Sequence, residues 1–330
     1  MKRILVIGAG LIGARHVRAV LDHPGCGLAG VVDPDPARRE GHGAPGFADL
    51  DAVEVAVDGA IIASPTGMHL AHARDCAARG WDLLIEKPVA GTLAEADALV
   101  SATRGVATLV GHHRRYHASV AALKSVLDSG RIGRPVLASL IWAMKKPDEY
   151  FHSWRGGAGG SPVMINLVHD IDLLRFFLGE VTAVTGLGSS AIRGAGRVES
   201  GVAVLGFSGG ATASIAFADT TPSPWGFEAG TGENPNIAAS GQDMMWIAGI
   251  SGAVSYPSLT VWEGAAHWGE APVPSVAACE KTHALTAQLA HFVDVMDRAA
   301  APMVSARDAR GTLAVALQIE AALACREAAA

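Results

Sequence analysis

The sequence lacks several features that would place it in a broad class of proteins. It has no excess of positive charge, because 26 Lys and Arg residues stand against 32 Asp and Glu residues. We therefore expect neither a nucleic-acid nor an anionic-membrane partner, since both are bound through basic surfaces. An apolar run long enough to cross a bilayer is also missing.

Cysteine is scarce and scattered. The four cysteines form no Cys-x-x-Cys pair, which argues against a zinc or redox motif and predicts buried, reduced thiols. They are Cys26, Cys76, Cys279 and Cys325. The opening Met1-Lys2-Arg3 leads straight into Ile4–Ile7, without the longer apolar stretch and cleavage site of a signal peptide. We expect a cytoplasmic protein that holds no metal.

At 330 residues the chain is long enough for two domains. Its first third alternates helical patterns with short apolar runs that lack polar alternation, as do buried strands of a parallel sheet. Strands are expected at 4–7, 28–32, 60–63, 83–85 and 108–110, and helices at 11–21, 69–79, 93–103 and 120–127. This order predicts an α/β domain with a doubly wound, parallel Rossmann sheet at residues 1–117.

The pattern changes after about residue 133, where strand patterns follow one another closely. Strands are expected at 136–143, 181–186, 201–207, 211–217, 243–247 and 258–262, and helices at 168–178, 283–298 and 305–324. Residues 220–239 are rich in Pro, Gly and Asn and are expected to form a loop. Residues 118–330 are therefore expected to form an α+β domain with a large, open, mainly antiparallel sheet.

A glycine motif directly follows the first expected strand. Gly8, Gly10 and Gly13 have the spacing Gly-x-Gly-x-x-Gly and lead into the expected helix at 11–21. Gly8 permits the tight turn, Gly10 lets the backbone approach a pyrophosphate, and Gly13 lets helix and strand pack closely. The motif alone is a weak signal, but Asp33 closes the second strand 20 residues after Gly13 (33 − 13), as a ribose-binding acid does. The sequence therefore predicts a dinucleotide site.

Asp33 also bears on which dinucleotide binds. A carboxylate accepts hydrogen bonds from a ribose 2′-hydroxyl and repels a 2′-phosphate, which favours NAD over NADP. Arg38 and Arg39 lie close behind Asp33 and could hold a phosphate, so NADP stays open.

Two further segments carry residues suited to hydride-transfer chemistry. Lys87 lies in Glu86-Lys87-Pro88, directly after the strand at 83–85, at the sheet edge where doubly wound folds bind ligands. His169 and Asp172 are three residues apart on an expected helix and share a face, which Asn166 joins if the helix starts early enough. A buried core or capping role for His169 is the alternative.

Together these residues resemble the Gfo/Idh/MocA oxidoreductases, named for glucose-fructose oxidoreductase and inositol dehydrogenase. The resemblance covers essentially the whole chain. It rests on the glycine motif, Ser64-Pro65-Thr66 with His69, Glu86-Lys87-Pro88, Gly111–Tyr116 and His169–Leu174. The resemblance implies that Lys87 contacts both nicotinamide and substrate, that His169 is the acid/base group, and that Asp172 binds a substrate hydroxyl and orients His169.

The expected cofactor contacts extend along the first domain. They are Gly8, Gly10, Leu11, Ile12, Gly13, Asp33, Arg38, Ser64, Pro65, Thr66, His69, Glu86, Lys87, His113 and Arg115. One departure concerns the second domain: many sugar and inositol dehydrogenases of the family carry an Asp four residues before the histidine, where this chain has Ile165. Asn166 follows it and can bind a substrate hydroxyl or carbonyl, but it cannot titrate.

Two other polar clusters have alternative interpretations. His113 and His117 have the helical i,i+4 spacing of metal ligands, but no nearby carboxylate or cysteine completes a set. The segment Lys145–Tyr150, followed by Trp154 and Arg155, offers cations for a carboxylate and aromatic faces for a ring; a solvated loop is the alternative. The expected substrate-binding residues are Lys87, Tyr150, Trp154, Arg155, Asn166, His169 and Asp172.

These expectations define the function that the sequence predicts. It is hydride transfer between NAD(P) and a secondary alcohol of a sugar, cyclitol or related polyhydroxylated ring, with His169 as the base and Lys87 stabilising the alkoxide. A redox-assisted, NAD-dependent glycosidase and a non-catalytic dinucleotide-sensing regulator are the alternatives. The resemblance also implies a homodimer or homotetramer through the open sheet.

Overall fold

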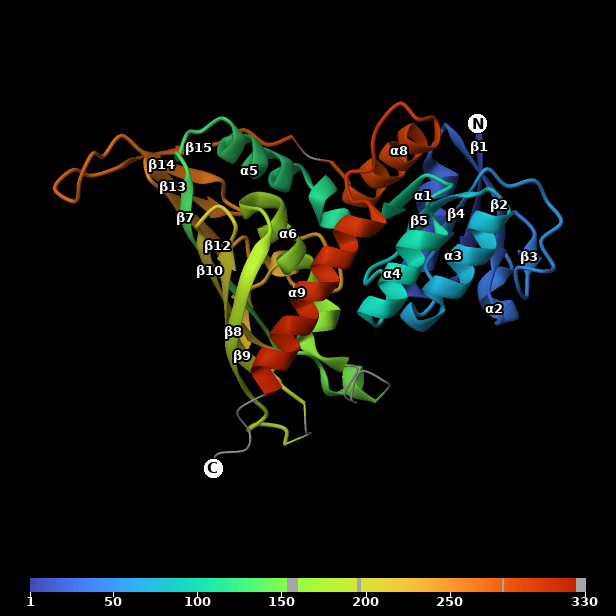
Figure 1. Cartoon of the computed structure of the whole chain (residues 1–330), viewed down its shortest axis with the longest axis horizontal. Helices are drawn as coiled ribbons and strands as arrows, with labels where there is room; N and C mark the ends of the chain where they lie inside the picture. The colour runs from blue at the N-terminus through green and yellow to red at the C-terminus, as the bar shows by residue number, and fades with distance from the viewer. Residues whose placement is uncertain (153–159, 195–196, 281, 325–330) are drawn as a thin grey trace. The chain divides into compact units, whose positions relative to one another are not determined.

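The computed structural model describes residues 1–152, 160–194, 197–280 and 282–324 (Figure 1). The chain divides into two compact units: residues 1–117 with 282–314, and residues 118–281 with 315–330. The first division falls after residue 117. Residues 282–314, which the sequence analysis assigned to the second domain, instead pack with the first unit, because an apolar helix within them covers that unit's sheet.

The first unit contains a six-stranded sheet in the order β3-β2-β1-β4-β5-β6. Every ladder in it is parallel, which confirms the expected Rossmann sheet. The strands are β1 (Lys2–Ile7), β2 (Cys26–Val32), β3 (Gly46–Phe47), β4 (Gly59–Ile62), β5 (Asp82–Ile85) and β6 (Thr108–Val110). Because all run in one direction, their carboxyl ends share one edge of the sheet.

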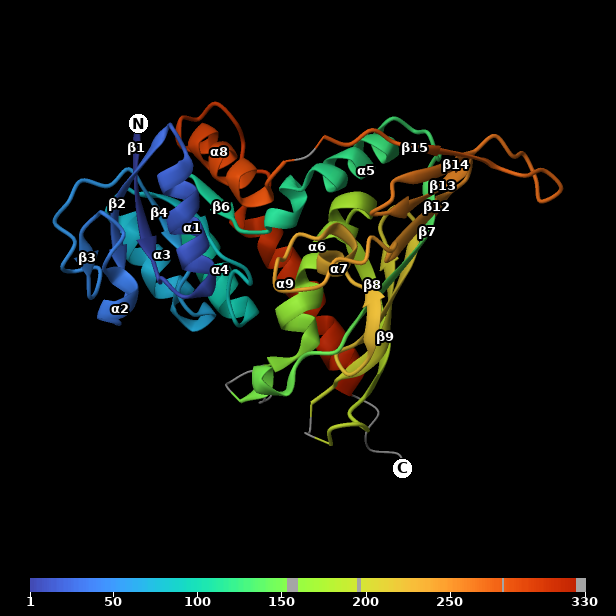
Figure 2. The ribbon, with the colours of Figure 1, turned by 180° about the vertical axis from the view of Figure 1, so that it is seen from behind.

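Helices cover both faces of this sheet (Figure 2). On one face, α1 and α8 pack together through an apolar core that includes Val17, Leu289 and Phe292. On the other, α3 contacts α4. The helices are α1 (Leu11–Asp22), α2 (Pro36–Arg39), η1 (Thr66–Met68), α3 (His69–Ala78), α4 (Leu93–Ala102), η2 (His113–Tyr116) and α8 (Ala284–Met296).

The second unit is built on a nine-stranded sheet in the order β15-β14-β13-β12-β7-β10-β9-β8, with β11 added beside β7. Within this sheet, only β7 and β10 pair in parallel among the described strands. The strands are β7 (Pro135–Met144), β8 (Val181–Ser189), β9 (Ser200–Phe207), β10 (Thr212–Ala218), β11 (Pro222–Trp225), β12 (Met245–Gly249), β13 (Gly252–Tyr256), β14 (Thr260–Glu263) and β15 (Val273–Val276).

The expectation for residues 220–239 was wrong in part. That segment contains β11 and the short helix α7 (Phe227–Thr231), so it is not a continuous loop. Phe227 is fully buried and stacks on Tyr256, and this burial of an aromatic side chain stabilises helical structure that the glycine-rich local sequence disfavours.

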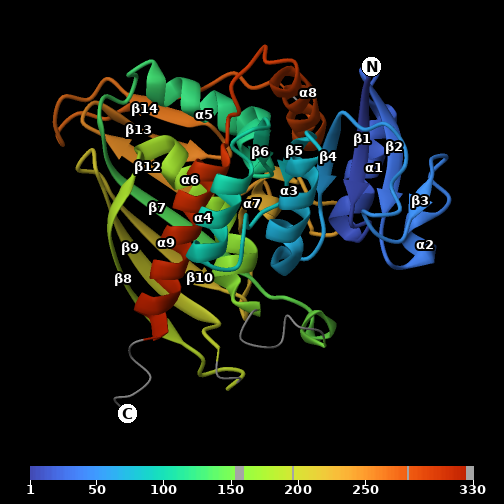
Figure 3. The same ribbon diagram turned by 45° about the vertical axis from the view of Figure 1, so that its right-hand side comes forward.

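One face of the second sheet carries helices (Figure 3). They are α5 (Ala118–Asp128), α6 (Val168–Leu178), which follows a π-helical turn η6 (Val163–Leu167), and the end of α9 (Ala306–Ala324), which begins in the first unit. The short η3 (Asp148–Phe151) follows β7. None of the helices in the described residues is long and apolar enough to span a membrane.

The opposite face of this sheet is also apolar. Large side chains on it are 37–53% exposed. They are Leu137, Leu187, Val202, Val204 and Trp246. The strand registers place these residues on one face, because Leu187 pairs with Val202, and Val204 joins Trp246 through Ser214 and Ser139.

Candidate functional site

The predicted cofactor residues of the first unit gather at the carboxyl edge of its sheet. Gly8 follows β1, Asp33 follows β2, Ser64 comes two residues after β4, and Glu86 follows β5. The edge of a doubly wound sheet is where such folds bind nucleotides, so a pattern spread over about eighty residues of sequence becomes one surface.

The glycine turn has the geometry that its spacing predicts. Gly8 has φ +87°, and a Cβ there would lie 2.7 Å from the Ser64 backbone. A Cβ on Gly13 would lie 1.8 Å from the Gly8 carbonyl oxygen. Around Gly10, in contrast, a Cβ would meet nothing within 4 Å. Two glycines therefore allow close packing, and the third leaves open space at the start of α1, where Leu11 and Ile12 begin the helix.

Asp33 holds the glycine turn in place. Its Oδ2 accepts a 2.8 Å hydrogen bond from Ala9 N, and its Oδ1 accepts one of 2.9 Å from Asp35 N. The side chain is buried. Arg38 is exposed and forms an ion pair with Asp35. Asp33 thus has a structural role that the sequence analysis did not assign, beside the predicted ribose contact.

Two histidines of α3 hydrogen-bond to the turn that follows β4. His69 Nε2 donates to the Ser64 carbonyl at 2.9 Å, and a 2.9 Å hydrogen bond joins Ser64 Oγ to His72 Nδ1. Burial lowers the pKa of His69, against the hydrogen bond to Ser64, which raises it. Pro65 and Thr66 follow at the start of η1. His69, predicted to contact the cofactor, is placed to support the turn.

A buried hydrogen bond between His16 and Glu86 lies beneath the Glu86-Lys87-Pro88 turn. Glu86 is 5% exposed and His16, on α1, is 1% exposed. His16 Nε2 lies 2.8 Å from Glu86 Oε1, and Glu86 Oε2 accepts a 3.1 Å hydrogen bond from Lys87 N. Burial by itself would raise the pKa of Glu86, but the hydrogen bond from His16 and the charges of His16, His113 and Lys87 lower it to about 2. Glu86 is therefore an ionised carboxylate.

This hydrogen bond gives Glu86 a structural role beside the predicted cofactor contact, and it brings in a residue, His16, that was not expected from the sequence. Glu86 joins α1 to the backbone of Lys87, so it supports the lysine, whose side chain is half-buried. The sequence analysis missed His16. The signal was present, because a histidine stands between the apolar positions Gly13 and Val17 that α1 buries.

The segment after β6 is fixed by an ion pair. Arg115, on η2, is buried; its Nη2 lies 2.9 Å from Asp308 Oδ2 and its Nη1 donates to the Met303 carbonyl at 3.3 Å. His113 lies on the same turn, close enough for its charge to lower the pKa of Glu86. Arg115 therefore anchors η2, and His113 lies beside the lysine turn.

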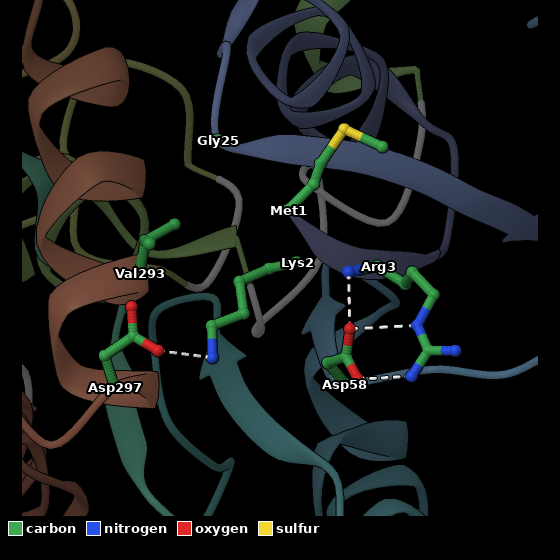
Figure 4. Close-up of a pocket in the computed structure, with 7 residues that line it drawn as sticks. All are labelled: Met1, Lys2, Arg3, Gly25, Asp58, Val293 and Asp297. Atoms are coloured by element: carbon green, nitrogen blue, oxygen red, sulfur yellow. Dashed lines mark hydrogen bonds and ion pairs between the residues drawn. The ribbon is translucent and has the colours of Figure 1, made fainter.

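A polar pocket in the first unit lies away from these residues (Figure 4). It is lined by Met1, Lys2, Arg3, Gly25, Asp58, Val293 and Asp297. Most of these residues lie at the amino ends of β1, β2 and β4, which form the opposite edge of the sheet. Lys2 pairs with Asp297, and Arg3 with Asp58. Because its charges neutralise one another, the pocket is not a candidate site.

Helix α6 of the second unit carries an unusual set of buried polar residues. His169, Asp170, Asp172 and Arg175 are all buried, among apolar neighbours such as Leu174. Ionisable side chains are rarely buried in such number without a function. The structure therefore keeps His169 and Asp172 together on one helix, as the sequence predicted.

The helix is also extended at its start. The π-helical turn η6 carries Asn166 onto the same continuous helical segment as His169. Asn166 Oδ1 is buried and makes no hydrogen bond with any described residue. A π turn widens a helix locally and is frequent at functional sites. Asn166 is thus a candidate for binding a polar ligand group.

Of the remaining substrate candidates, the structure describes only Tyr150. Tyr150 lies on η3, and Lys146 precedes it as a buried residue. Trp154 and Arg155 lie outside the described residues. Within the described ranges, no group of three or more His, Cys, Asp or Glu residues could hold a metal ion.

Comparison with known proteins places this arrangement in a family. Residues 2–112 match the model of the oxidoreductase family with an NAD-binding Rossmann fold, GFO_IDH_MocA. Residues 120–252 match the GFO/IDH/MocA C-terminal domain. A crystal structure of an oxidoreductase from Agrobacterium radiobacter, in complex with NAD+, L-tartaric acid and magnesium, has a TM-score of 0.84 over 98% of this chain and 96% of that chain. At 19% identity, this likeness concerns the fold.

Curated relatives agree with the family models. Inositol 2-dehydrogenase of Streptomyces avermitilis is 37% identical over 202 residues, which are 55% of this chain and 55% of that protein. The rhizopine catabolism protein MocA of Rhizobium meliloti is 33% identical over 187 residues, 54% of this chain and 57% of that protein. The chain thus spans about half the length of these relatives. The two family models together match most of the chain, which belongs to the Gfo/Idh/MocA family of oxidoreductases.

Proposed function

We propose that the protein is an NAD-dependent oxidoreductase that transfers a hydride between the cofactor and a secondary alcohol of a polyhydroxylated small molecule. The observation that carries the proposal is the placement of Lys87. It follows β5 at the sheet edge that the glycine turn shares, and its backbone is held by the buried carboxylate of Glu86. A cation held in position at a nucleotide-binding edge is suited to stabilise developing negative charge.

The residues of this edge fit a dinucleotide. The open space at Gly10 admits a pyrophosphate to the start of α1, whose N-terminal N–H groups favour anions. Asp33 favours the 2′-hydroxyl of NAD. When bound, the nicotinamide accepts or donates the hydride.

The protein residues move the proton and stabilise charge. His169 takes the proton of the substrate hydroxyl, and Asp172, three residues along α6, orients the imidazole. Lys87, as an ammonium, stabilises the alkoxide. Asn166 binds a neighbouring hydroxyl, because its amide can accept and donate hydrogen bonds but not titrate.

The names of relatives and of a structural neighbour support a polyhydroxylated substrate. One is named an inositol 2-dehydrogenase, and the structure from Agrobacterium radiobacter contains L-tartaric acid, a hydroxy acid. We propose a sugar, a cyclitol or a hydroxylated acid as the substrate.

The first test is a screen of the purified protein with NAD and NADP against inositols, sugars and hydroxylated acids, following absorbance of the reduced nicotinamide. Reduction with NAD preferred is expected. Turnover of a glycoside without net NADH would instead indicate a glycosidase. Tight NAD binding without any reaction in either direction would indicate a regulator.

Variants test the two units separately. Lys87→Met and His169→Ala are each expected to lower kcat by roughly 10³-fold while NAD affinity changes less than about threefold, since both groups act on the reaction. Lys2→Met, at the opposite edge of the sheet, is the control and should keep full activity. Retention of more than a tenth of kcat in Lys87→Met would contradict the assignment.

We further propose that the apolar outer face of the nine-stranded sheet binds a second copy of the chain, giving a dimer or tetramer. Exposed apolar patches of this kind mark interfaces, and Leu187, Val202 and Val204 lie together on it. Light scattering should give a multiple of 33.8 kDa. Val204→Glu should give the monomer mass, and a monomer in the unmodified protein would overturn the proposal.

A further inference from the structure

The end of β7 places a lysine inside the second unit. Lys146 comes two residues after the strand, and its backbone N–H donates to the Asp219 carbonyl at 3.2 Å, which fixes the chain beside the end of β10. Lys146 is 7% exposed, whereas its neighbour Lys145 is exposed. The sequence offered both as candidates for binding an anion, and the structure separates them.

Two buried donors near this point lack acceptors. Lys146 Nζ and Trp142 Nε1 make no hydrogen bond with any residue that the structure describes. Trp142 is 1% exposed, and Lys146 Nζ lies 5.5 Å from the centre of its ring. Buried N–H groups without acceptors are rare in folded proteins because each forfeits its hydration. Two together indicate that an acceptor belongs there.

Aromatic faces surround the ammonium but do not supply that acceptor. Lys146 Nζ lies 4.7 Å from the centre of the Tyr150 ring. Tyr150 is half-buried and makes an edge contact with Phe151. Ring faces attract a cation and leave its N–H groups without hydrogen bonds.

The acidic side chain with the largest electrostatic effect on Lys146, Asp219, is already engaged in ion pairs. Asp219 forms ion pairs with Arg193 and with Arg197, the latter at 3.0 Å. Both guanidinium groups also stack on Phe151, at 4.3 and 4.7 Å from its centre. Burial lowers the pKa of Lys146 to about 8; Asp219 and Glu228 act against this, and Arg197 and Arg193 add to it. At neutral pH Lys146 is therefore a buried cation without a hydrogen-bonded counter-ion.

We propose that Lys146 and Trp142 form a subsite for the carboxylate of the substrate, so that the protein acts on polyhydroxylated acids. A carboxylate has two oxygens, each able to accept, and the subsite offers one cationic and one neutral donor. The inference rests on the proposed oxidoreductase function and deepens it, because it selects among sugars, cyclitols and hydroxylated acids.

Binding to the NAD-loaded protein tests this subsite without requiring turnover. The probes are matched pairs: glucuronate with glucose, gluconate with glucitol, and quinate with myo-inositol, titrated by calorimetry. At least one acid should bind tenfold or more tightly than its neutral partner. In Lys146→Met and Lys146→Gln this preference should disappear, and in Trp142→Phe it should weaken. Lys145→Met, the exposed neighbour, should keep it. Inorganic sulfate should compete only weakly, since a free anion lacks the hydroxyl contacts.

The outcomes separate the inference from the proposed function. If no acid in the panel binds more tightly than its neutral partner, or if Lys146→Met keeps the preference, the subsite is refuted and a trapped water is the missing acceptor. If the acid preference holds but no probe reacts, the oxidoreductase proposal fails and the subsite stands.

Stability of the ligand-free protein gives a second measurement. Lys146 is a buried cation without a hydrogen-bonded counter-ion among the described residues, and such a group destabilises the fold. Lys146→Met should therefore raise Tm, and Lys145→Met should leave it unchanged. A lower Tm for Lys146→Met would mean that the lysine serves the fold, and would overturn the proposal.

Discussion

Glu86 in the first unit and Lys146 in the second are both buried charged side chains, but they differ in their hydrogen bonding. In the first unit, the Glu86 carboxylate is hydrogen-bonded to His16 at 2.8 Å and to the backbone N–H of Lys87, so both of its oxygens have donors within the fold. In the second, Lys146 has aromatic rings for neighbours and no hydrogen bond from its Nζ to the described residues. Burying a charge is costly unless it is paired. The hydrogen-bonded pair of His16 and Glu86 therefore stabilises the fold. Lys146, which has no such partner among the described residues, marks a place where a ligand can bind.

The largest change in stability is expected when the hydrogen-bond partner of Glu86 is removed. His16→Ala leaves a buried carboxylate without its imidazole, which should lower the free energy of unfolding by about 3–5 kcal/mol. His16→Gln should cost less, because its amide can still donate to Glu86. Urea denaturation at pH 7 measures both. Arg18→Ala, on the exposed side of the same helix, is the control and should change stability by less than about 0.5 kcal/mol. If His16→Ala lowers the free energy of unfolding by less than about 1 kcal/mol, the pair of His16 and Glu86 does not stabilise the fold as proposed.

The pH dependence of stability should report the same pair, with a somewhat smaller effect. The pKa of Glu86 is lowered from 4.5 to about 2 on folding. Its contribution is therefore complete above pH 4.5 and is lost as pH falls from 4.5 towards 2. Glu86→Gln should be less stable than the unmodified protein at pH 6 by on the order of 3 kcal/mol, and this gap should shrink to about half or less by pH 3. Melting temperatures of both proteins from pH 6 to 3 would measure it, and a constant gap would refute the assignment.

The smallest expected effect has the opposite sign. Lys146→Met should stabilise the ligand-free protein by about 1 kcal/mol at pH 7, since the lost cation–π contacts partly offset the relief of a buried charge. Folding lowers the pKa of Lys146 from 10.5 to about 8. The advantage of the variant should therefore be full below pH 8 and shrink as pH rises towards 10.5. Urea midpoints at pH 7 and pH 10 would detect this change, and an equal difference at both would contradict it.

Local sequence predicted the features that depend on local chemistry. The glycine turn, Asp33 and the alternating strands and helices of the first unit follow from spacing and periodicity, and Gly8 and Gly13 have the close contacts that their spacing required. The helix with His169 and Asp172 was likewise visible as a 3.6-residue pattern. In each case a short stretch of chain determines the outcome.

Other features depend on residues far apart in the sequence. His16 and Glu86 are separated by 70 positions, and neither residue alone indicates the pair. The burial of Lys146, unlike Lys145, depends on Trp142, Tyr150 and the end of β10. The packing of 282–314 with the first unit depends on Leu289 and Phe292 meeting the Rossmann sheet. Such contacts are set by tertiary structure, which periodicity does not encode.

Asp33 accepts two backbone hydrogen bonds, and these limit how cofactor preference can be redesigned. An engineer who wants the protein to accept a 2′-phosphate would first replace this aspartate, since it repels that group. Its two oxygens, however, also accept from Ala9 N and Asp35 N, so Asp33→Ala would loosen the phosphate-binding turn itself. Asp33→Asn keeps one oxygen acceptor, for Ala9 N, and removes the charge. With the exposed Arg38 retained to hold the phosphate, it is the substitution that separates cofactor choice from the integrity of the turn.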